Sequence, residues 1–125
     1  MVVDALIVAG PSGDAAREVL DAQLIIEAPA ILKAEAVSAM RRFESREELA
    51  TDHALAALDR LSRLGVRSYP VDPFLPRIWE LRATVSAYDA WYVALAEELG
   101  TDLLTMDGRL ASASGPRCPI LVVGS

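Results

Sequence analysis

The sequence predicts an α/β fold with a central, mainly parallel sheet that is covered by helices on both faces. Segments of strand character alternate along the chain with segments of helical period, a pattern typical of such sheets. The 125 residues are enough for one buried core, and 53% of them are hydrophobic, which excludes a disordered chain. No linker, repeat or low-complexity tract interrupts the sequence, so we expect a single domain over residues 1–125.

The first half of the chain is expected to begin with an apolar run that forms a strand or a strand passing into a helix. Ser45-x-x-Glu48 matches a capping box and predicts the start of a helix, which Gly65 would end. Pro29 is expected to stop the second strand. The expected ranges are an apolar run at 1–8, a turn at 10–13, a helix at 14–22, a strand at 24–26, a helix at 30–44 and a helix from 45 to about 64.

The second half carries clearer helix boundaries. Asp72-Pro73 predicts a helix start with proline in the first turn. Ser86-x-x-Asp89 predicts the next helix start, and Gly100 its end. The expected ranges are a strand at 66–71, a helix from 72 to about 84, a helix from 86 to 100, a strand at 103–105, a short helix or turn around 110 and a strand at 120–123.

Charge and composition exclude several classes of function. Taken alone, the net charge of −6 argues against a nucleic-acid-binding protein, and favours a basic partner or acids gathered around a cation. One cysteine, Cys118, excludes an internal disulfide, and one histidine, His53, gives little support for a catalytic triad. No apolar stretch approaches the roughly 18 residues of a membrane span. We therefore expect a cytoplasmic protein with no membrane partner.

Four acidic residues stand in apolar surroundings or at the ends of expected strands. Asp4 follows Val2-Val3, and Asp107 follows the expected strand at 103–105. Glu35 shares a helix face with apolar residues, and Asp89 is the only charged residue between positions 83 and 96. Other acids, Glu97 among them, have polar neighbours and are interpreted as ordinary surface residues.

These four acids are the candidate metal ligands of the chain. A carboxylate on an apolar face is costly to bury unless a cation compensates it. The chain has a single lysine, and most of its arginines stand on polar helix faces, so ion pairs cannot serve all four acids. Mg²⁺ or Mn²⁺, which prefer oxygen ligands, would compensate the charge and activate water for attack on a phosphodiester.

Each acid also has an ordinary structural interpretation that the sequence leaves open. Asp89 fits the capping box of Ser86, and Asp107 fits a turn or a helix cap before Gly108. Glu35 fits an ion pair with Lys33 or Arg42, and Asp4 fits a solvated chain end.

Two further groups of residues have weaker functional signals. Arg41, Arg42 and Arg46 form a basic group near Glu35, which is either a solvated helix face or a guide for a phosphate backbone. The aromatic residues at helical spacings favour a core or a dimer interface over platforms for base stacking; these are Trp79, Trp91 and Tyr92.

Three segments of the sequence resemble one known family. The stretch 86–96, with Tyr88-Asp89-Ala90, and the stretch 103–110, with Leu104-Thr105-Met106-Asp107, resemble the carboxyl-terminal half of the PIN-domain ribonuclease toxins of the VapC family. The segment 28–42, with Ala34-Glu35-Ala36, resembles their second acidic motif. The resemblance implies a three-layer α/β/α fold, Mg²⁺ or Mn²⁺ as cofactor, RNA as substrate, a VapB-type antitoxin as partner, and a homodimer.

The resemblance also assigns roles to individual residues. Asp89 and Asp107 match the family's carboxyl-terminal acids, Glu35 matches the middle acid, and Thr105 matches a position that often carries a hydroxyl near the metal. The family usually opens with a strand that ends in Asp-x-Ser, whereas Asp4 here is followed by Ala5-Leu6. Either Asp4 is the first metal ligand, or the usual first strand and its aspartate are missing from the site.

The sequence therefore supports two functional hypotheses. The first is a metal-dependent endoribonuclease toxin in which Asp4, Glu35, Asp89 and Asp107 form one acidic pocket at the carboxyl edge of the sheet. Thr105 would support that pocket, and Arg41 and Arg42 would guide RNA toward it. The alternative is a catalytically impaired interaction module of the same fold, which the altered amino end favours.

Overall fold

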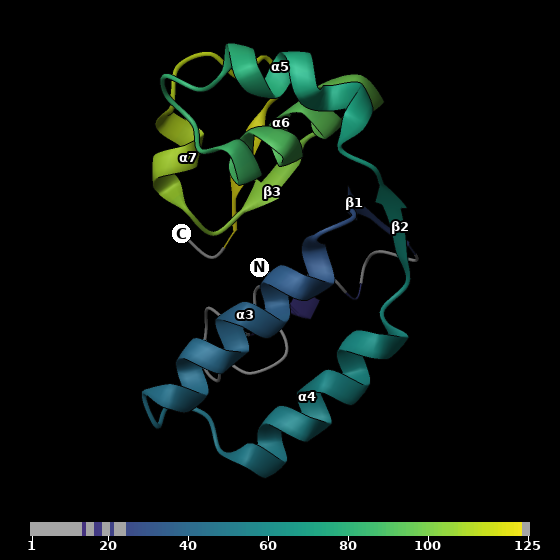
Figure 1. Ribbon diagram of the computed structural model, residues 1–125, viewed down its shortest axis with the longest axis vertical. Helices are drawn as coiled ribbons and strands as arrows, with labels where there is room; N and C mark the ends of the chain where they lie inside the picture. The colour runs from purple at the N-terminus through teal and green to yellow at the C-terminus, as the bar shows by residue number, and fades with distance from the viewer. Residues whose placement is uncertain (1–13, 15–16, 19–20, 22–24, 124–125) are drawn as a thin grey trace. The chain divides into compact units, whose positions relative to one another are not determined.

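The computed structural model describes residues 14, 17, 18, 21 and 25–123 (Figure 1). These residues belong to two compact units, one containing 31–67 and the other containing 28–30 and 68–123. The expectation of a single domain over 1–125 stays a prediction. Asp4 and the expected first strand lie outside the described residues. The isolated residues 14, 17, 18 and 21 have helical backbone, as expected for 14–22.

The first unit contains a hairpin of two helices, α3 (Leu32–Ser45) and α4 (Thr51–Arg63). Small residues allow these helices to approach closely, since Ala57 is fully buried and Ala36 is 3% exposed. Larger apolar side chains fill the space on either side of them in two clusters, formed by Ala36 and Leu61 with Leu32 and Leu64, and by Met40, Leu49 and Ala57 with Phe43 and Ala54.

The capping box expected at Ser45 is wrong. Ser45 is the last residue of α3, and its hydroxyl donates to the carbonyl of Arg42, 2.9 Å away. The following turn includes Glu47 with a positive φ of 60°, and α4 begins at Thr51 without a side-chain cap. Serine at a helix end bonds the backbone of the preceding turn as readily as that of the next one, so the motif misplaced the boundary.

Two short strands, β1 (Ile26–Pro29) and β2 (Val66–Tyr69), pair with each other. β1 begins two residues later than expected, and Pro29 is its last residue rather than the residue that stops it. β2 ends at Tyr69, before Pro70, which has no N–H to donate to a neighbouring strand.

The second unit begins with a helical segment that is broken where one helix over 72–84 was expected. A 3₁₀ turn, η1 (Asp72–Phe74), leads into the short helix α5 (Leu75–Glu80). Pro76 cannot donate to the carbonyl of Asp72 four residues before it, and the N–H of Leu75 bonds that carbonyl instead. Turns follow at 81–84.

Helix α6 (Ala87–Leu99) contributes more buried residues than any other element of the described chain, and its ends agree with the sequence prediction. The hydroxyl of Ser86 accepts the N–H of Asp89 at 3.2 Å, and Gly100 ends the helix in the left-handed conformation. On one face of α6, Ala90 and Val93 pack with Leu81 and Val85. On a second face, Ala94 and Leu95 pack with Phe74.

After α6 the chain forms β3 (Leu103–Thr105), the short helix α7 (Gly108–Ser112) and β4 (Ile120–Val122). β3 and β4 are parallel, with Leu103 opposite Ile120 and Thr105 opposite Val122. Helices thus alternate with parallel strands, and the predicted α/β class is confirmed. In the described part of the chain, no helix combines the length and apolarity needed to cross a membrane.

The conformation of Gly100 makes a first prediction. Its φ of +64° is unfavourable for residues with a Cβ, although no atom lies within 4 Å of the position a Cβ would take. We expect Gly100→Ala to lower the free energy of unfolding by about 1 kcal/mol, as measured by urea denaturation. Gly108→Ala is the matched control, because that position is equally open and has no positive φ. Equal stabilities of the two variants would contradict the prediction.

Candidate active site

Asp107 lies just beyond the carboxyl end of β3 and caps the amino end of α7. Its Oδ1 accepts the N–H of Arg109 at 2.9 Å, and its own N–H donates to Oγ1 of Thr105 at 3.0 Å. The N–H of Val123 donates to the carbonyl of Thr105 at 2.7 Å, so the backbone beneath Asp107 is tied to the strand beside it. Ligand-binding residues of parallel sheets are commonly found at such strand ends.

The electrostatic surroundings of Asp107 keep its carboxylate charged. The backbone N–H of Arg109 lowers the pKa of Asp107 most, and hydrogen bonding from the Arg109 side chain lowers it further. The guanidinium Nε of Arg109 lies 3.3 Å from Oδ1 of Asp107. The side chain of Arg109 is 93% exposed, and an ion pair this accessible to water contributes little to stability, so Asp107 stays open to another cation.

Asp89 lies in the first turn of α6, in the same unit as Asp107. The expectation that Asp89 stands on a buried apolar face is wrong, because its side chain is exposed. Ala90, Val93 and Ala94 form the buried face of α6. Asp89 precedes Ala90 by one residue, a rotation of about 100° around the helix axis, and so lies away from this face. The structural interpretation through Ser86 is confirmed for the backbone N–H of Asp89, which leaves its carboxylate available as a ligand.

Glu35 and the two guiding arginines belong to the other unit. Glu35 lies in the first turn of α3 and is partly buried, with its N–H bonded to the carbonyl of Ile31 at 2.9 Å. Arg41 and Arg42 lie near the end of the same helix and are exposed, and Arg42 donates to Oγ of Ser38 at 3.4 Å. Their assignment to the site stays a prediction.

The meeting of the four acids also stays a prediction. Asp4 is outside the described residues, and Glu35 is in a different unit from Asp89 and Asp107. Within residues 14, 17, 18, 21 and 25–123, no three acids, histidines or cysteines form a metal-binding group. The donor chemistry of Asp89 and Asp107 nevertheless fits Mg²⁺ or Mn²⁺, because both offer solvent-accessible carboxylate oxygens and Asp107 is held ionised.

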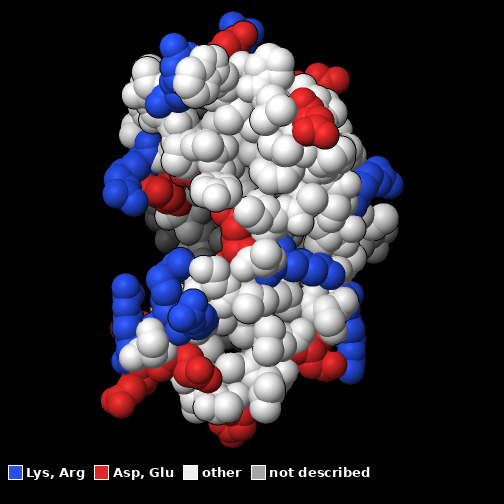
Figure 2. All heavy atoms as spheres, viewed as in Figure 1, with Lys and Arg blue, Asp and Glu red and all other residues white. Residues whose placement is uncertain are grey.

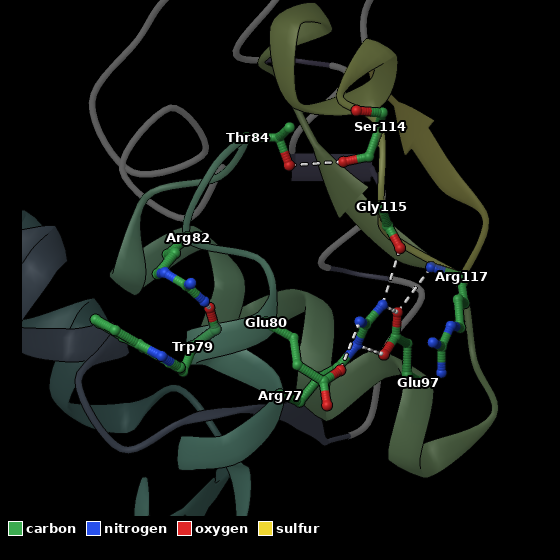
Figure 3. A network of polar contacts seen from close by, with 9 residues as sticks. All are labelled: Arg77, Trp79, Glu80, Arg82, Thr84, Glu97, Ser114, Gly115 and Arg117. Atoms are coloured by element: carbon green, nitrogen blue, oxygen red, sulfur yellow. Dashed lines mark hydrogen bonds and ion pairs between the residues drawn. The ribbon is translucent and has the colours of Figure 1, made fainter.

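The second unit contains one charged cluster that the sequence interpretation missed (Figure 3). Arg77 of α5 binds Glu97 of α6 through two hydrogen bonds, with Nε 2.8 Å from Oε1 and one terminal nitrogen 3.0 Å from Oε2. The same terminal nitrogen donates to the carbonyl of Gly115 at 2.8 Å, and the N–H of Arg117 donates to Oε2 of Glu97 at 2.7 Å. The interpretation of Glu97 as an ordinary surface acid was therefore wrong.

The Arg77–Glu97 pair fastens the segment before β4 to helices α5 and α6. The side chains of Arg77 and Glu97 are only 19% and 16% exposed. The signal for Glu97 was present in the sequence, since Glu97 follows Val93 by four residues and Ala94 by three on the apolar side of α6. Its partner lies 20 residues away in the chain, beyond the reach of a helical pattern.

Charged side chains are sparse on the surface of the second unit that Figure 2 shows. The large apolar side chains that are exposed in this unit are Leu75, Trp79, Tyr88 and Leu121. Trp79 is 66% exposed, so the core alternative is wrong for this residue, and the dimer interface stays a prediction. Trp91 and Tyr92 of α6 are partly buried, and Trp91 packs against the cluster around Phe74.

Comparison with known proteins gives consistent matches over nearly the whole chain. Residues 2–116 match the model of the PIN domain. The chain is similar to Ribonuclease VapC1 of Mycobacterium tuberculosis, with 44% identity over 98% of this chain and 92% of the relative. It is 43% identical to Ribonuclease VapC9 of the same organism, over 86% of this chain and 84% of the relative. Ribonuclease VapC12 is 36% identical, over 94% of this chain and 91% of the relative.

The Arg77–Glu97 pair makes a prediction about pH. The hydrogen bond from Arg77 holds the pKa of Glu97 below its ordinary value of 4.5, against the opposing effect of burial. A lowered pKa in the folded state means that the pair stabilises the protein above pH 4.5, and that this contribution is lost as the pH falls through the lowered pKa.

We expect Glu97→Gln to lower the free energy of unfolding at pH 7 by about 1–3 kcal/mol, because Arg77 loses its less exposed charged partner and keeps only the exposed Glu80. The difference from the parent should shrink as the pH falls below 4.5, as measured by urea denaturation at a series of pH values. Glu98→Gln is the control, since Glu98 is the next residue of α6 and is exposed. A difference that is independent of pH would show that charge pairing is not the cause.

Proposed function

Because the chain belongs to the PIN-domain family, and within it to the VapC group, we propose that it is a metal-dependent endoribonuclease and the toxin of a toxin–antitoxin pair. The resemblance seen in the motifs around Asp89 and Asp107 is confirmed by the family match over residues 2–116. The observation that supports the activity most is the similarity over 98% of the chain to a protein named as a ribonuclease.

The proposed site is built on Asp89 and Asp107, two accessible carboxylates of one compact unit. Both would hold Mg²⁺ or Mn²⁺, together with Asp4 and Glu35. The cation would supply charge stabilisation at the phosphate and an activated water. Oγ1 of Thr105 accepts the backbone N–H of Asp107, and this contact would help to position Asp107 at the end of β3.

The remaining residues of the proposal serve binding. Arg41 and Arg42 are exposed cations, and they would contact the RNA backbone on its way to the acids. Since the net charge is −6, RNA binding would depend on such local cations and on the bound metal. The same acidic balance suits a basic segment of a VapB-type antitoxin, and we propose that antitoxin as the partner of a homodimeric toxin.

Substitution of the two acids tests the activity. We expect Asp89→Asn and Asp107→Asn each to reduce cleavage of single-stranded RNA with Mg²⁺ or Mn²⁺ by about 100-fold or more, because loss of a metal ligand removes several kcal/mol of charge stabilisation. Cleavage is measured by gel electrophoresis of end-labelled RNA. Asp102→Asn is the control, since Asp102 is exposed and precedes the amino end of β3. Unchanged cleavage in both site variants would contradict the proposal.

Removal of the metal tests the cofactor and the role of Asp4. We expect EDTA to abolish cleavage and added Mg²⁺ or Mn²⁺ to restore it, because without a cation the acids repel the phosphate.

Asp4→Asn should abolish cleavage if Asp4 is a ligand, and leave it unchanged if the site lacks a first aspartate. A parent chain that binds the antitoxin yet cleaves no RNA at any metal concentration would support the impaired interaction module instead.

A further inference from the structure

An indole and a guanidinium stack on each other at the surface of the second unit. The guanidinium carbon of Arg82 lies 4.4 Å from the ring centroid of Trp79, and Figure 3 shows the two side chains against each other. One terminal nitrogen of Arg82 also donates to the carbonyl of Trp79 at 2.8 Å. This hydrogen bond holds the guanidinium beside the ring, so two contacts support the stack.

Both members of the stack are accessible to a ligand. Trp79 is 66% exposed, the largest fraction among the exposed large apolar residues of the described chain, and Arg82 is exposed as well. Five other arginines pair with acids: Arg17, Arg63, Arg67, Arg77 and Arg109. Within the described ranges Arg82 makes no ion pair, so these residues leave its charge unneutralised.

The turn that carries Arg82 shares its packing with the first turns of α6. Arg82 lies in the turns between α5 and α6, beside Leu81, which is 2% exposed. Leu81 and Val85 pack in one buried cluster with Ala90, the residue after Asp89. The backbone that carries Arg82 is thus fixed to the first turns of the helix that carries Asp89. Tyr88, which precedes Asp89, is 59% exposed and adds a second accessible ring.

We propose that Trp79 and Arg82 form a binding subsite for single-stranded RNA, in which the indole stacks on an unpaired base and the guanidinium binds an adjacent phosphate. This inference rests on the proposed ribonuclease function and adds a substrate-binding site outside the acids. An aromatic ring beside an unneutralised arginine matches both parts of a single-stranded nucleotide, its flat base and its charged phosphate. Such a subsite suits an acidic chain, because stacking does not require a basic surface.

The test measures RNA binding apart from RNA cleavage. All chains carry Asp89→Asn, so that a fluorescein-labelled single-stranded RNA stays intact in the presence of Mg²⁺, and affinity is read by fluorescence anisotropy. We expect Trp79→Ala to weaken binding about ten-fold, with Trp79→Phe intermediate. Arg82→Gln should weaken binding and reduce the slope of log affinity against log salt by about 0.7, whereas Trp79→Ala should leave the slope unchanged.

Two controls keep the result specific. Leu75→Ala removes another exposed apolar side chain one turn earlier on α5, and it should leave RNA affinity unchanged. Arg82→Lys keeps the charge but loses the planar stack, so it should weaken binding while preserving the salt slope. Thermal melting and sedimentation of every variant should match those of the parent, because Trp79 and Arg82 are exposed.

The outcomes separate this inference from the proposed function. Parental RNA affinity in Trp79→Ala and Arg82→Gln, while the chain with Asp89 intact still cleaves RNA, would overturn the subsite and leave the ribonuclease standing. A change in molecular mass in Trp79→Ala would overturn it too, by marking the stack as a protein interface. If the chain with Asp89 intact neither binds nor cleaves RNA, both the function and the subsite fail.

Discussion

The burial of helix α6 is the constraint on which the described part of the second unit depends. Ala90 and Val93 have no exposed surface, and Ala94 has 3%. These small side chains let the short helix α5 and strand β3 pack against α6. Because the buried face is fixed, the remaining positions of α6 are fixed as well, with Asp89 exposed at the first turn and Glu97 partly buried at the last. The packing of α6 therefore determines the positions of both the candidate ligand Asp89 and the Arg77–Glu97 ion pair.

The acids at the two ends of α6 have opposite surroundings. Glu97 is compensated by the protein itself, through Arg77 and the N–H of Arg117, and so it contributes to holding the segment before β4. The side chain of Asp89 is exposed, and its backbone N–H donates to Oγ of Ser86. An acid satisfied by a partly buried arginine stabilises structure, whereas an acid exposed at a helix start remains free for chemistry. This contrast separates the structural acid from the candidate ligand more clearly than apolar context does.

The sequence predicted the elements whose boundaries are set locally. Ser86 and Gly100 cap α6 as expected, since each acts on backbone groups a few residues away. The helix start predicted at Ser45 was wrong for a local reason as well. Its hydroxyl can bond backbone groups on either side of it, and it donates to the carbonyl of Arg42. The pairing of Arg77 with Glu97 was not predictable, since nothing in a helical pattern identifies a partner on another element. For the candidate site, the assignment of Asp89 and Asp107 as metal ligands stays a prediction, and the apolar surroundings expected for Asp89 are wrong because its side chain is exposed.

The exposure of Asp89 changes what a cation does at such a site. A buried carboxylate would need a metal to offset its desolvation, so the metal would be part of the fold. Asp89 is solvated, and Asp107 accepts hydrogen bonds from the N–H and guanidinium of Arg109, so neither carboxylate carries a burial cost that a metal would have to offset. In the proposed function, a metal would then serve the chemistry rather than the stability of this unit. In the proposed site, two accessible carboxylates would attract a cation and repel a phosphate, so the cation would link an acidic protein to a polyanionic substrate.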